Sequence, residues 1–217
     1  MKVGTDGVLL GAWVTVSGKK KIADIGTGSG LIALMLAQRS EAEIHAIDID
    51  SSACSQATEN SAGSLFSNRI QVYHISLNAF AAQSNNLYDL IVSNPPYFKA
   101  SLLSPVHERN LARHNDSLSL KSLIEDSLKL LSPRGCIALI LPCDREEELN
   151  RLVAEFKLFF SRKTYIRPVP DAPRKRILAE ITRCDSGSEQ NELTIEESRH
   201  EYTKEYIDLT KDFYLKM

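Results

Sequence analysis

Apolar runs alternate with amphipathic stretches along most of the chain, which predicts a parallel sheet covered by helices on both faces. We expect strands near residues 20–25, 43–48, 70–75, 88–93, 135–141, 163–169 and 176–182, and helices near residues 29–39, 51–62, 117–132 and 145–160. Only Pro170-Asp171-Ala172-Pro173 separates the last two strands, so we expect them to form an antiparallel hairpin. The predicted fold class is α/β, with a doubly wound and mostly parallel sheet of seven strands.

Length and composition agree with one α/β unit. The chain has 217 residues and shows no internal repeat or linker, so we predict a single domain over residues 1–217. A formal net charge of −2 gives no general signal for a nucleic-acid partner. No apolar run approaches the roughly 20 residues of a membrane span, and no leader-like segment opens the sequence, so we expect no membrane partner.

The four cysteines are scattered, without a Cys-x-x-Cys pair or a histidine at ligand spacing. We therefore predict a reduced, cytoplasmic protein without a metal site. No obligate protein partner is readable in the sequence.

A glycine-rich loop, Asp24-Ile25-Gly26-Thr27-Gly28-Ser29-Gly30, follows the first predicted strand and opens onto an apolar helix. Glycine at every second position lets the backbone turn sharply and lets a ligand lie against the main chain. The spacing differs from the Gly-x-Gly-x-x-Gly pattern of dinucleotide folds, and the Lys-Ser/Thr of a P-loop is absent. The negative charge of Asp24 would repel a pyrophosphate and attract a cation. A ligand that carries an α-amino group and a sulfonium fits that polarity.

The next predicted strand ends in Asp48, eighteen positions after Gly30. An acid about twenty residues beyond such a loop is where a carboxylate holds a ribose diol. We therefore predict that Asp48 binds a ribose. Asp50 or Ser51 is better placed to cap the helix that follows.

Asn94-Pro95-Pro96-Tyr97 follows the apolar strand at residues 88–93. Each proline lacks an N–H and fixes φ, so the chain leaves the sheet along one stiff path. That path presents the Asn94 amide, the Pro95 carbonyl and the Tyr97 ring at the carboxyl end of a strand, where open α/β sheets bind ligands.

Together these motifs resemble a class I S-adenosylmethionine-dependent methyltransferase of the amino-methylating kind. The opening segment from Met1 to Trp13, Ala112-Arg113-His114 and the tail from Tyr202 to Leu215 resemble the bacterial tRNA1(Val) (adenine-N6)-methyltransferases, which modify the adenine beside the anticodon. The resemblance covers essentially the whole chain. It implies a Rossmann-like methyltransferase fold with strand order 3-2-1-4-5-7-6 and the last strand antiparallel. It also implies tRNA as substrate, S-adenosyl-L-methionine as cofactor and S-adenosyl-L-homocysteine as product.

The resemblance assigns further residues to the cofactor. Gly26, Gly28, Gly30 and Asn94 are expected to bind it, together with Asp24, Asp48, Ile49, Ser76 and Leu77. Ser76 stands where an acid often meets the adenine amino group, and a hydroxyl there bonds more weakly. Family members usually carry a further stretch before the opening segment, which is expected to contribute to the cofactor lid or the substrate contact.

The expected role of the Asn-Pro-Pro-Tyr turn follows from the low reactivity of the adenine amino group. An adenine amino group is a poor nucleophile because its lone pair is delocalised into the ring. The Asn94 side-chain oxygen and the Pro95 carbonyl would accept its two N–H bonds and free that lone pair. Tyr97, or Phe98 beside it, would stack on the base, a contact worth about 1–3 kcal/mol in single-stranded nucleic acids.

Two basic groups are candidates for contacts with RNA phosphates. One follows the Asn-Pro-Pro-Tyr turn: Lys99, Arg109 and Arg113. The other lies in the terminal hairpin, where residues 162–176 hold six basic side chains: Arg162, Lys163, Arg167, Arg174, Lys175 and Arg176. Solvated loops explain such charges equally well. Residues 185–201 hold six acids.

Several rival functions stay open on the residues alone. The same turn serves methylation of a protein glutamine N5, of DNA adenine or of another RNA base, because each offers a planar, conjugated nitrogen. A non-catalytic cofactor-binding module and a nicotinamide oxidoreductase are further alternatives. The intact turn disfavours the first of these, and the glycine spacing disfavours the second.

Overall fold

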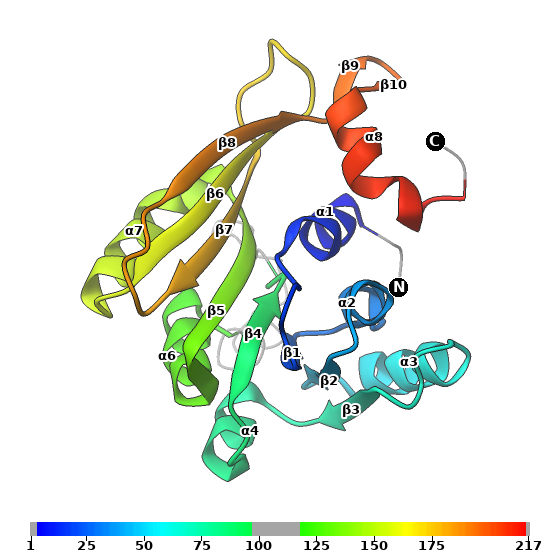
Figure 1. Ribbon diagram of the computed structural model, residues 1–217, viewed down its shortest axis with the longest axis vertical. Helices are drawn as coiled ribbons and strands as arrows, with labels where there is room; N and C mark the ends of the chain where they lie inside the picture. The colour runs from blue at the N-terminus through cyan, green and yellow to red at the C-terminus, as the bar shows by residue number, and fades with distance from the viewer. Residues whose placement is uncertain (1–3, 97–117, 216–217) are drawn as a thin grey trace, which may run out of the picture.

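The computed structural model describes residues 4–96 and 118–215 (Figure 1). Within these ranges eight strands form one sheet, in the order β3-β2-β1-β4-β5-β7-β6-β8. The strands are β1 (Lys21–Ile25), β2 (Glu43–Asp48), β3 (Ile70–His74), β4 (Tyr88–Ser93), β5 (Leu131–Pro142), β6 (Phe159–Arg167), β7 (Arg176–Thr182) and β8 (Glu189–Thr194). The short strands β9 (Glu196–Ser198) and β10 (Glu201–Tyr202) pair separately. The helices are α1 (Thr5–Trp13), α2 (Leu31–Arg39), α3 (Ser51–Ala62), α4 (Leu77–Gln83), α6 (Leu120–Leu130), α7 (Glu146–Glu155) and α8 (Lys204–Thr210), with short 3-10 turns at Cys143–Arg145 and Lys211–Phe213.

The predicted α/β fold and strand order are confirmed, including the antiparallel β7, which pairs with both β5 and β6. The predicted count of seven strands is wrong by one. β8 adds an eighth strand, parallel to β6, in a segment for which no strand was predicted. Its side chains are mostly exposed, with Leu193 alone buried, so the strand carries no apolar run that would reveal it.

Alternate residues of the central strands pack against opposite layers of helices. In β5, Ala138 and Ile140 contribute to the core beneath α1 and α2, whereas Ile137 and Leu139 contribute to the core beneath α6 and α7. Burial on both faces explains why these strands are continuous apolar runs in the sequence. Figure 1 shows α1, α2 and α8 on one side of the sheet, with α4, α6 and α7 on the other.

Several boundaries differ from the predicted ranges for local reasons. The helix expected from residue 117 begins at Leu120, because the Ser119 hydroxyl accepts a hydrogen bond from Ser122 N and caps it. The helix expected over 145–160 ends at Glu155, and the chain turns through Lys157, at φ 54°, into β6. β6 therefore begins four residues earlier than the expected residue 163.

Helix α1 was not among the predicted helices. Its residues from Gly7 to Trp13 are all buried, so it has no polar face that would produce a helical period. Among the described residues, no helix combines the length and the apolar character needed to cross a lipid bilayer.

Candidate active site at the carboxyl edge of the sheet

The glycine loop and the Asn-Pro-Pro segment leave the sheet side by side. β1 and β4 are parallel neighbours, and Ile25 at the end of β1 is in register with Ser93 at the end of β4. The buried Ser93 hydroxyl donates to the Ile25 carbonyl over 2.8 Å and ties the two strand ends together. Gly26 and Asn94 follow directly. Because β2 lies on the other side of β1, this is the point where the winding of the sheet reverses, and open α/β sheets bind ligands there.

The glycine loop needs glycine at three positions. Gly26, Gly28 and Gly30 have φ of 71°, 59° and 79°, a region that side chains with a Cβ rarely adopt. The amides of Gly26 and Thr27 donate to the Ile47 carbonyl at 2.8 and 3.1 Å, which fixes the loop against β2. A Cβ at Gly26 would meet nothing within 4 Å, so the loop backbone is open to a ligand there.

Asp24 lies fully buried at the end of β1, beneath the loop. Its Oδ2 accepts from the Thr27 hydroxyl at 2.6 Å and from the Ala33 amide at 3.1 Å. Its Oδ1 is buried and has no hydrogen-bond partner among the described residues. Burial raises the pKa of this carboxyl to about 6, although both hydrogen bonds oppose the shift. A buried acceptor without a donor is costly, so this oxygen is suited to a cationic or N–H donor supplied by a ligand.

Asp48 ends β2 on the other side of the loop. Its two oxygens accept from the Gly28 amide at 2.9 Å and from the Asp50 amide at 3.0 Å, which orients the carboxylate and leaves lone pairs on both atoms. Asp50 caps α3 through Ser52 N and Ala53 N, as predicted. The neighbouring Ile49 side chain is 56% exposed, an unusual state for an isoleucine.

Ser76 and Leu77 start the next helix. The Ser76 hydroxyl accepts from Ala79 N at 3.3 Å and caps α4, and Leu77 is buried. A capping hydroxyl still has its own hydrogen to donate, so the predicted contact with an adenine stays a prediction.

Asn94 is half-buried, Pro95 is buried and Pro96 is exposed. The other residues predicted around this turn lie outside the described residues: Tyr97, Phe98, Lys99, Arg109 and Arg113. Their predicted roles stay predictions.

The basic hairpin is largely paired with acids of the chain. Arg174 contacts Glu192 at 2.7 Å, its guanidinium lies 4.1 Å from the centroid of the Tyr165 ring, and Arg167 binds the same glutamate. Arg176 contacts Asp6 at 2.7 Å. The predicted roles of Arg174, Lys175 and Arg176 with RNA remain predictions.

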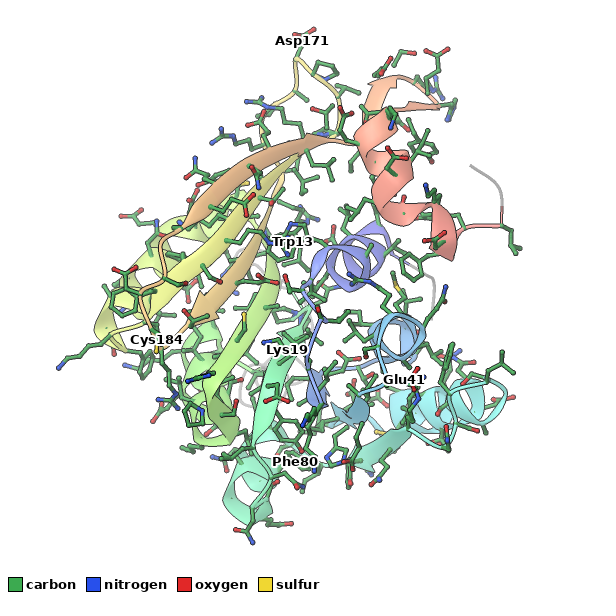
Figure 2. All side chains as sticks on the ribbon, viewed as in Figure 1. Trp13, Lys19, Glu41, Phe80, Asp171 and Cys184 are labelled. Atoms are coloured by element: carbon green, nitrogen blue, oxygen red, sulfur yellow. The ribbon has the colours of Figure 1, made fainter. Side chains whose placement is uncertain are left out.

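Glu192 of β8 and Asp6 of α1 therefore neutralise part of the hairpin's positive charge. Lys175 is exposed. The connection that contains Lys175 projects beyond the sheet, with Asp171 at its tip (Figure 2).

Sequence reasoning assigned no role to the first turn of α1, although the structure places it at this edge. Asp6 contacts Arg176, and a Cβ at Gly7 would lie 3.2 Å from the Leu31 side chain, directly after the glycine loop. The apolar opening segment from Met1 to Trp13 could have indicated this, because it was part of the resemblance. None of its residues was predicted to belong to the site.

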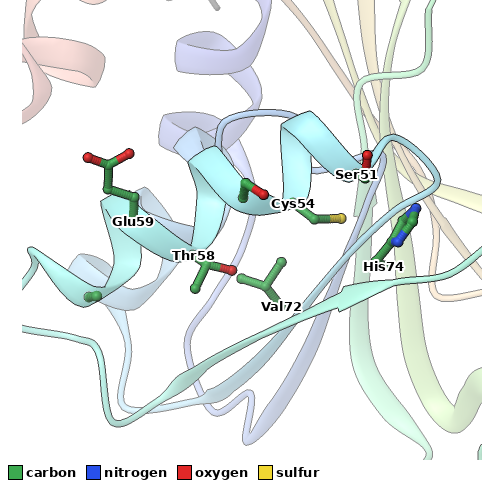
Figure 3. Close-up of a pocket in the computed structure, with 8 residues that line it drawn as sticks. Ser51, Cys54, Thr58, Glu59, Val72 and His74 are labelled. Carbon is green, nitrogen blue, oxygen red and sulfur yellow. The ribbon is translucent and has the colours of Figure 1, made fainter.

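A shallow groove lies between α3 and β3 (Figure 3), and none of the residues predicted to bind the cofactor or the RNA lines it. It is lined by Ser51, Cys54, Ser55, Thr58, Glu59, Ala62, Val72 and His74. Within the described residues, no cluster of three or more His, Cys, Asp or Glu side chains could hold a metal ion.

Residues 8–165 match the sequence profile of the methyltransferase small domain family. The whole chain is 55% identical, over 218 aligned residues and 92% of the relative's length, to a tRNA1(Val) (adenine(37)-N6)-methyltransferase of Parabacteroides distasonis. It is 46% identical to an enzyme of the same name from Trichodesmium erythraeum, again over all of this chain and 92% of the relative.

Solved structures agree on the fold. A predicted O-methyltransferase from Agrobacterium tumefaciens superimposes with a TM-score of 0.69 at 21% identity, over 95% of this chain and 96% of its own. A glycopeptide N-methyltransferase complexed with (S)-adenosyl-L-methionine gives a TM-score of 0.59 at 10% identity, over 84% of this chain and all of its own. With the site geometry and the full-length identity together, the chain belongs to the methyltransferase small domain family and, within it, to the tRNA1(Val) (adenine(37)-N6)-methyltransferases.

Proposed function

We propose that this protein transfers a methyl group from S-adenosyl-L-methionine to the N6 amine of an adenine in tRNA, in the anticodon loop of a valine tRNA by its relatives' names. The observation that carries the proposal is the pairing of the ends of β1 and β4, which brings the glycine loop and Asn94 to one point of the sheet edge. A cofactor held by the first and an amine held by the second would meet there.

The residues present fit S-adenosylmethionine. The unpartnered Asp24 Oδ1 would accept from its α-ammonium group, and the open backbone at Gly26 would take the amino-acid part of the molecule. The oriented Asp48 carboxylate would bind the ribose hydroxyls, and the exposed Ile49 side chain would cover the adenine. When bound, the cofactor supplies an already activated methyl group on its sulfonium. No metal is required by this chemistry.

The chain itself has to prepare the amine. The Asn94 side-chain oxygen and the Pro95 carbonyl would each accept one N–H of the adenine amine, which reduces the delocalisation of the nitrogen lone pair. The two prolines restrict the backbone that carries both acceptors, so little reorganisation is needed when the base arrives. Holding the two reactants in line can supply several kcal/mol of the barrier. No strong general base is needed, since the amine becomes acidic after transfer.

A base must be exposed to reach this edge. RNA duplexes hide their base edges, whereas loops offer them, and an anticodon loop already presents unpaired bases. Tyr97 or Phe98 would stack on the base after it enters. Lys175, exposed in the connection between β6 and β7, would meet a phosphate of the tRNA. A tRNA substrate would also place the protein in the cytoplasm.

The test is direct. The protein is incubated with labelled S-adenosylmethionine and total tRNA, and the RNA is digested to nucleosides. Label in N6-methyladenosine is the expected result, both from total tRNA and from purified valine tRNA. Parallel reactions contain DNA or protein in place of tRNA, and label there with none in tRNA would instead support one of the rival amines.

A further inference from the structure

The first turn of α1 contacts both the start of α2, which follows β1 and the glycine loop, and the start of β7. On one side, Gly7 packs against Leu31 and Ile32, the first residues of α2 after the glycine loop. On the other side, Asp6 contacts Arg176, the first residue of β7. The strand order between these two contacts is β1-β4-β5-β7. At about 4.8 Å between neighbouring strands, β1 and β7 are about 14 Å apart, and the ends of β4 and β5 lie between them.

Arg176 lies beyond the end of β4, on the same edge of the sheet. β5 continues three residues beyond Leu139, which is in register with Ser93, and its last residue, Pro142, pairs with Arg176. The main chain at Arg176 is held from both sides, because it also pairs with Ile166 of β6 and because the preceding Lys175 carbonyl accepts from Cys143 N at 3.2 Å. The guanidinium therefore extends from a fixed base. Its Nε donates to Asp6 Oδ2 over 2.7 Å.

The rest of α1 is fixed by contacts that do not reach its first turn. Gly11 packs so closely on Met35 that a Cβ would lie 2.8 Å from the sulfur. At the other end, the Trp13 indole donates to Thr164 and lies under the Arg162 guanidinium. The first turn has a glycine at its N-cap, Gly4, which provides no side-chain cap. In the part of the chain that the structure describes, the Asp6–Arg176 ion pair links this first turn to β7.

We propose that the Asp6–Arg176 ion pair holds the first turn of α1 as a wall of the active site, and that Arg176 is a positioning residue, not a phosphate ligand. This inference rests on the proposed function and refines it, because it removes one of the hairpin arginines from the RNA surface. The negative charge of Asp6 also suits the first turn of a helix, where unpaired amides favour anions. Asp6 and Arg176 then bind each other and neither binds the RNA.

The experiment compares Asp6→Asn, Arg176→Gln, the double variant and Arg176→Lys with the wild-type protein. Because both single changes remove the same contact, we expect each to lower kcat/KM for tRNA methylation by about tenfold, and the double variant to be no worse than either. Arg176→Lys should recover part of the loss. Amide hydrogen exchange should accelerate at Gly7 and Val8, whose N–H groups bond to the Gly4 carbonyl, and stay unchanged in β7.

A matched control is Lys21→Gln. It breaks an ion pair of similar exposure, with Lys21 and Glu43 side chains 28% and 40% exposed against 31% and 24% for Arg176 and Asp6. Lys21 and Glu43 begin β1 and β2, at the opposite edge of the sheet. This variant should match the wild type in kcat/KM and in exchange at Gly7 and Val8.

The salt dependence of tRNA binding separates positioning from phosphate binding. A lost phosphate contact reduces the slope of log affinity against log salt by about one. We expect the wild-type slope in Arg176→Gln and in Asp6→Asn. A reduced slope in Arg176→Gln together with wild-type behaviour of Asp6→Asn would overturn the proposal, as would unchanged exchange at Gly7 and Val8. If the wild-type protein methylates no tRNA, the proposed function fails, whereas the exchange measurement still decides whether the pair holds the turn.

Discussion

Cofactor binding should weaken in mild acid because the Asp24 carboxyl must be ionised to receive an ammonium group. In the ligand-free protein, burial raises its pKa from the ordinary 3.8 to about 6. A bound α-ammonium at the unpartnered Oδ1 would lower that pKa again, so binding below pH 6 has to expel a proton. At pH 5 about a tenth of the carboxyls are ionised, and the affinity should be about tenfold below its plateau at pH 8.

The same shift predicts a stability effect with a defined sign. A carboxyl whose folded-state pKa is raised stabilises the folded state fully below pH 4, and this contribution is lost as the pH rises through 6. A shift of about 2 pKa units corresponds to about 3 kcal/mol. The free energy of unfolding of the ligand-free protein, relative to Asp24→Asn, should therefore fall by about that amount between pH 4 and pH 7.

Calorimetric titration with S-adenosyl-L-homocysteine between pH 5 and 8 measures the affinity, and urea unfolding measures the stability. The Asp24→Asn variant should bind S-adenosyl-L-homocysteine more weakly than the wild type at pH 8, and its affinity should not change with pH. His74→Gln is the control, because it changes an ionisable side chain that contacts the Ile49 carbonyl, next to Asp48, and leaves Asp24 in place. The reasoning would be refuted if the affinity of the wild type for S-adenosyl-L-homocysteine did not change between pH 5 and 8. It would also be refuted if Asp24→Asn kept this pH dependence of the affinity, or if His74→Gln lost it.

Three further predictions follow from local geometry. Gly30→Ala should destabilise the protein by about 1–3 kcal/mol, since its φ is 79° and its Cβ would lie 3.3 Å from Ala57. Gly18 has a similar φ of 73°, but a Cβ there would meet nothing within 4 Å. Gly18→Ala should therefore lower the free energy of unfolding in urea by less than Gly30→Ala does. Arg162→Ala should cost about 3 kcal/mol in the same assay, because it leaves the buried Glu180 carboxylate without its ion pair; a loss below about 1 kcal/mol would contradict this. Lys175→Ala should reduce the salt slope of tRNA binding by about one, and an unchanged slope would exclude that phosphate contact.

The parts of the fold that the sequence revealed are those buried on both faces. β1, β4 and β7 are buried over most of their length, and they appear within a residue of the predicted positions. α1 escaped because it is apolar all round, and β8 escaped because it is a mostly exposed edge strand. In both cases the burial pattern is set by tertiary neighbours and not by a local period.

The residues of the candidate site also differ in how far the sequence alone revealed them. The turn at the glycine loop and the position of Asp48 at a strand end were readable because both leave a local signature, whereas their roles in binding stay predictions. The ion pairs of the hairpin were not readable, because Glu192 reaches Arg167 and Arg174 only through the pairing of β6 with β8. Asp6 and Arg176 are 170 positions apart in the chain and meet only in the fold. Charge counted along a sequence therefore overstates the charge available to a partner.

The central claim is that Asn94 activates the amine beside a cofactor bound at the glycine loop. Its most direct test is the single-turnover rate of tRNA methylation in Asn94→Ala, measured with the affinity for S-adenosyl-L-homocysteine. The account predicts a rate at least about a hundredfold below wild type, with an affinity within about threefold of wild type. A rate comparable to wild type, or a loss fully explained by weaker cofactor binding, would contradict it.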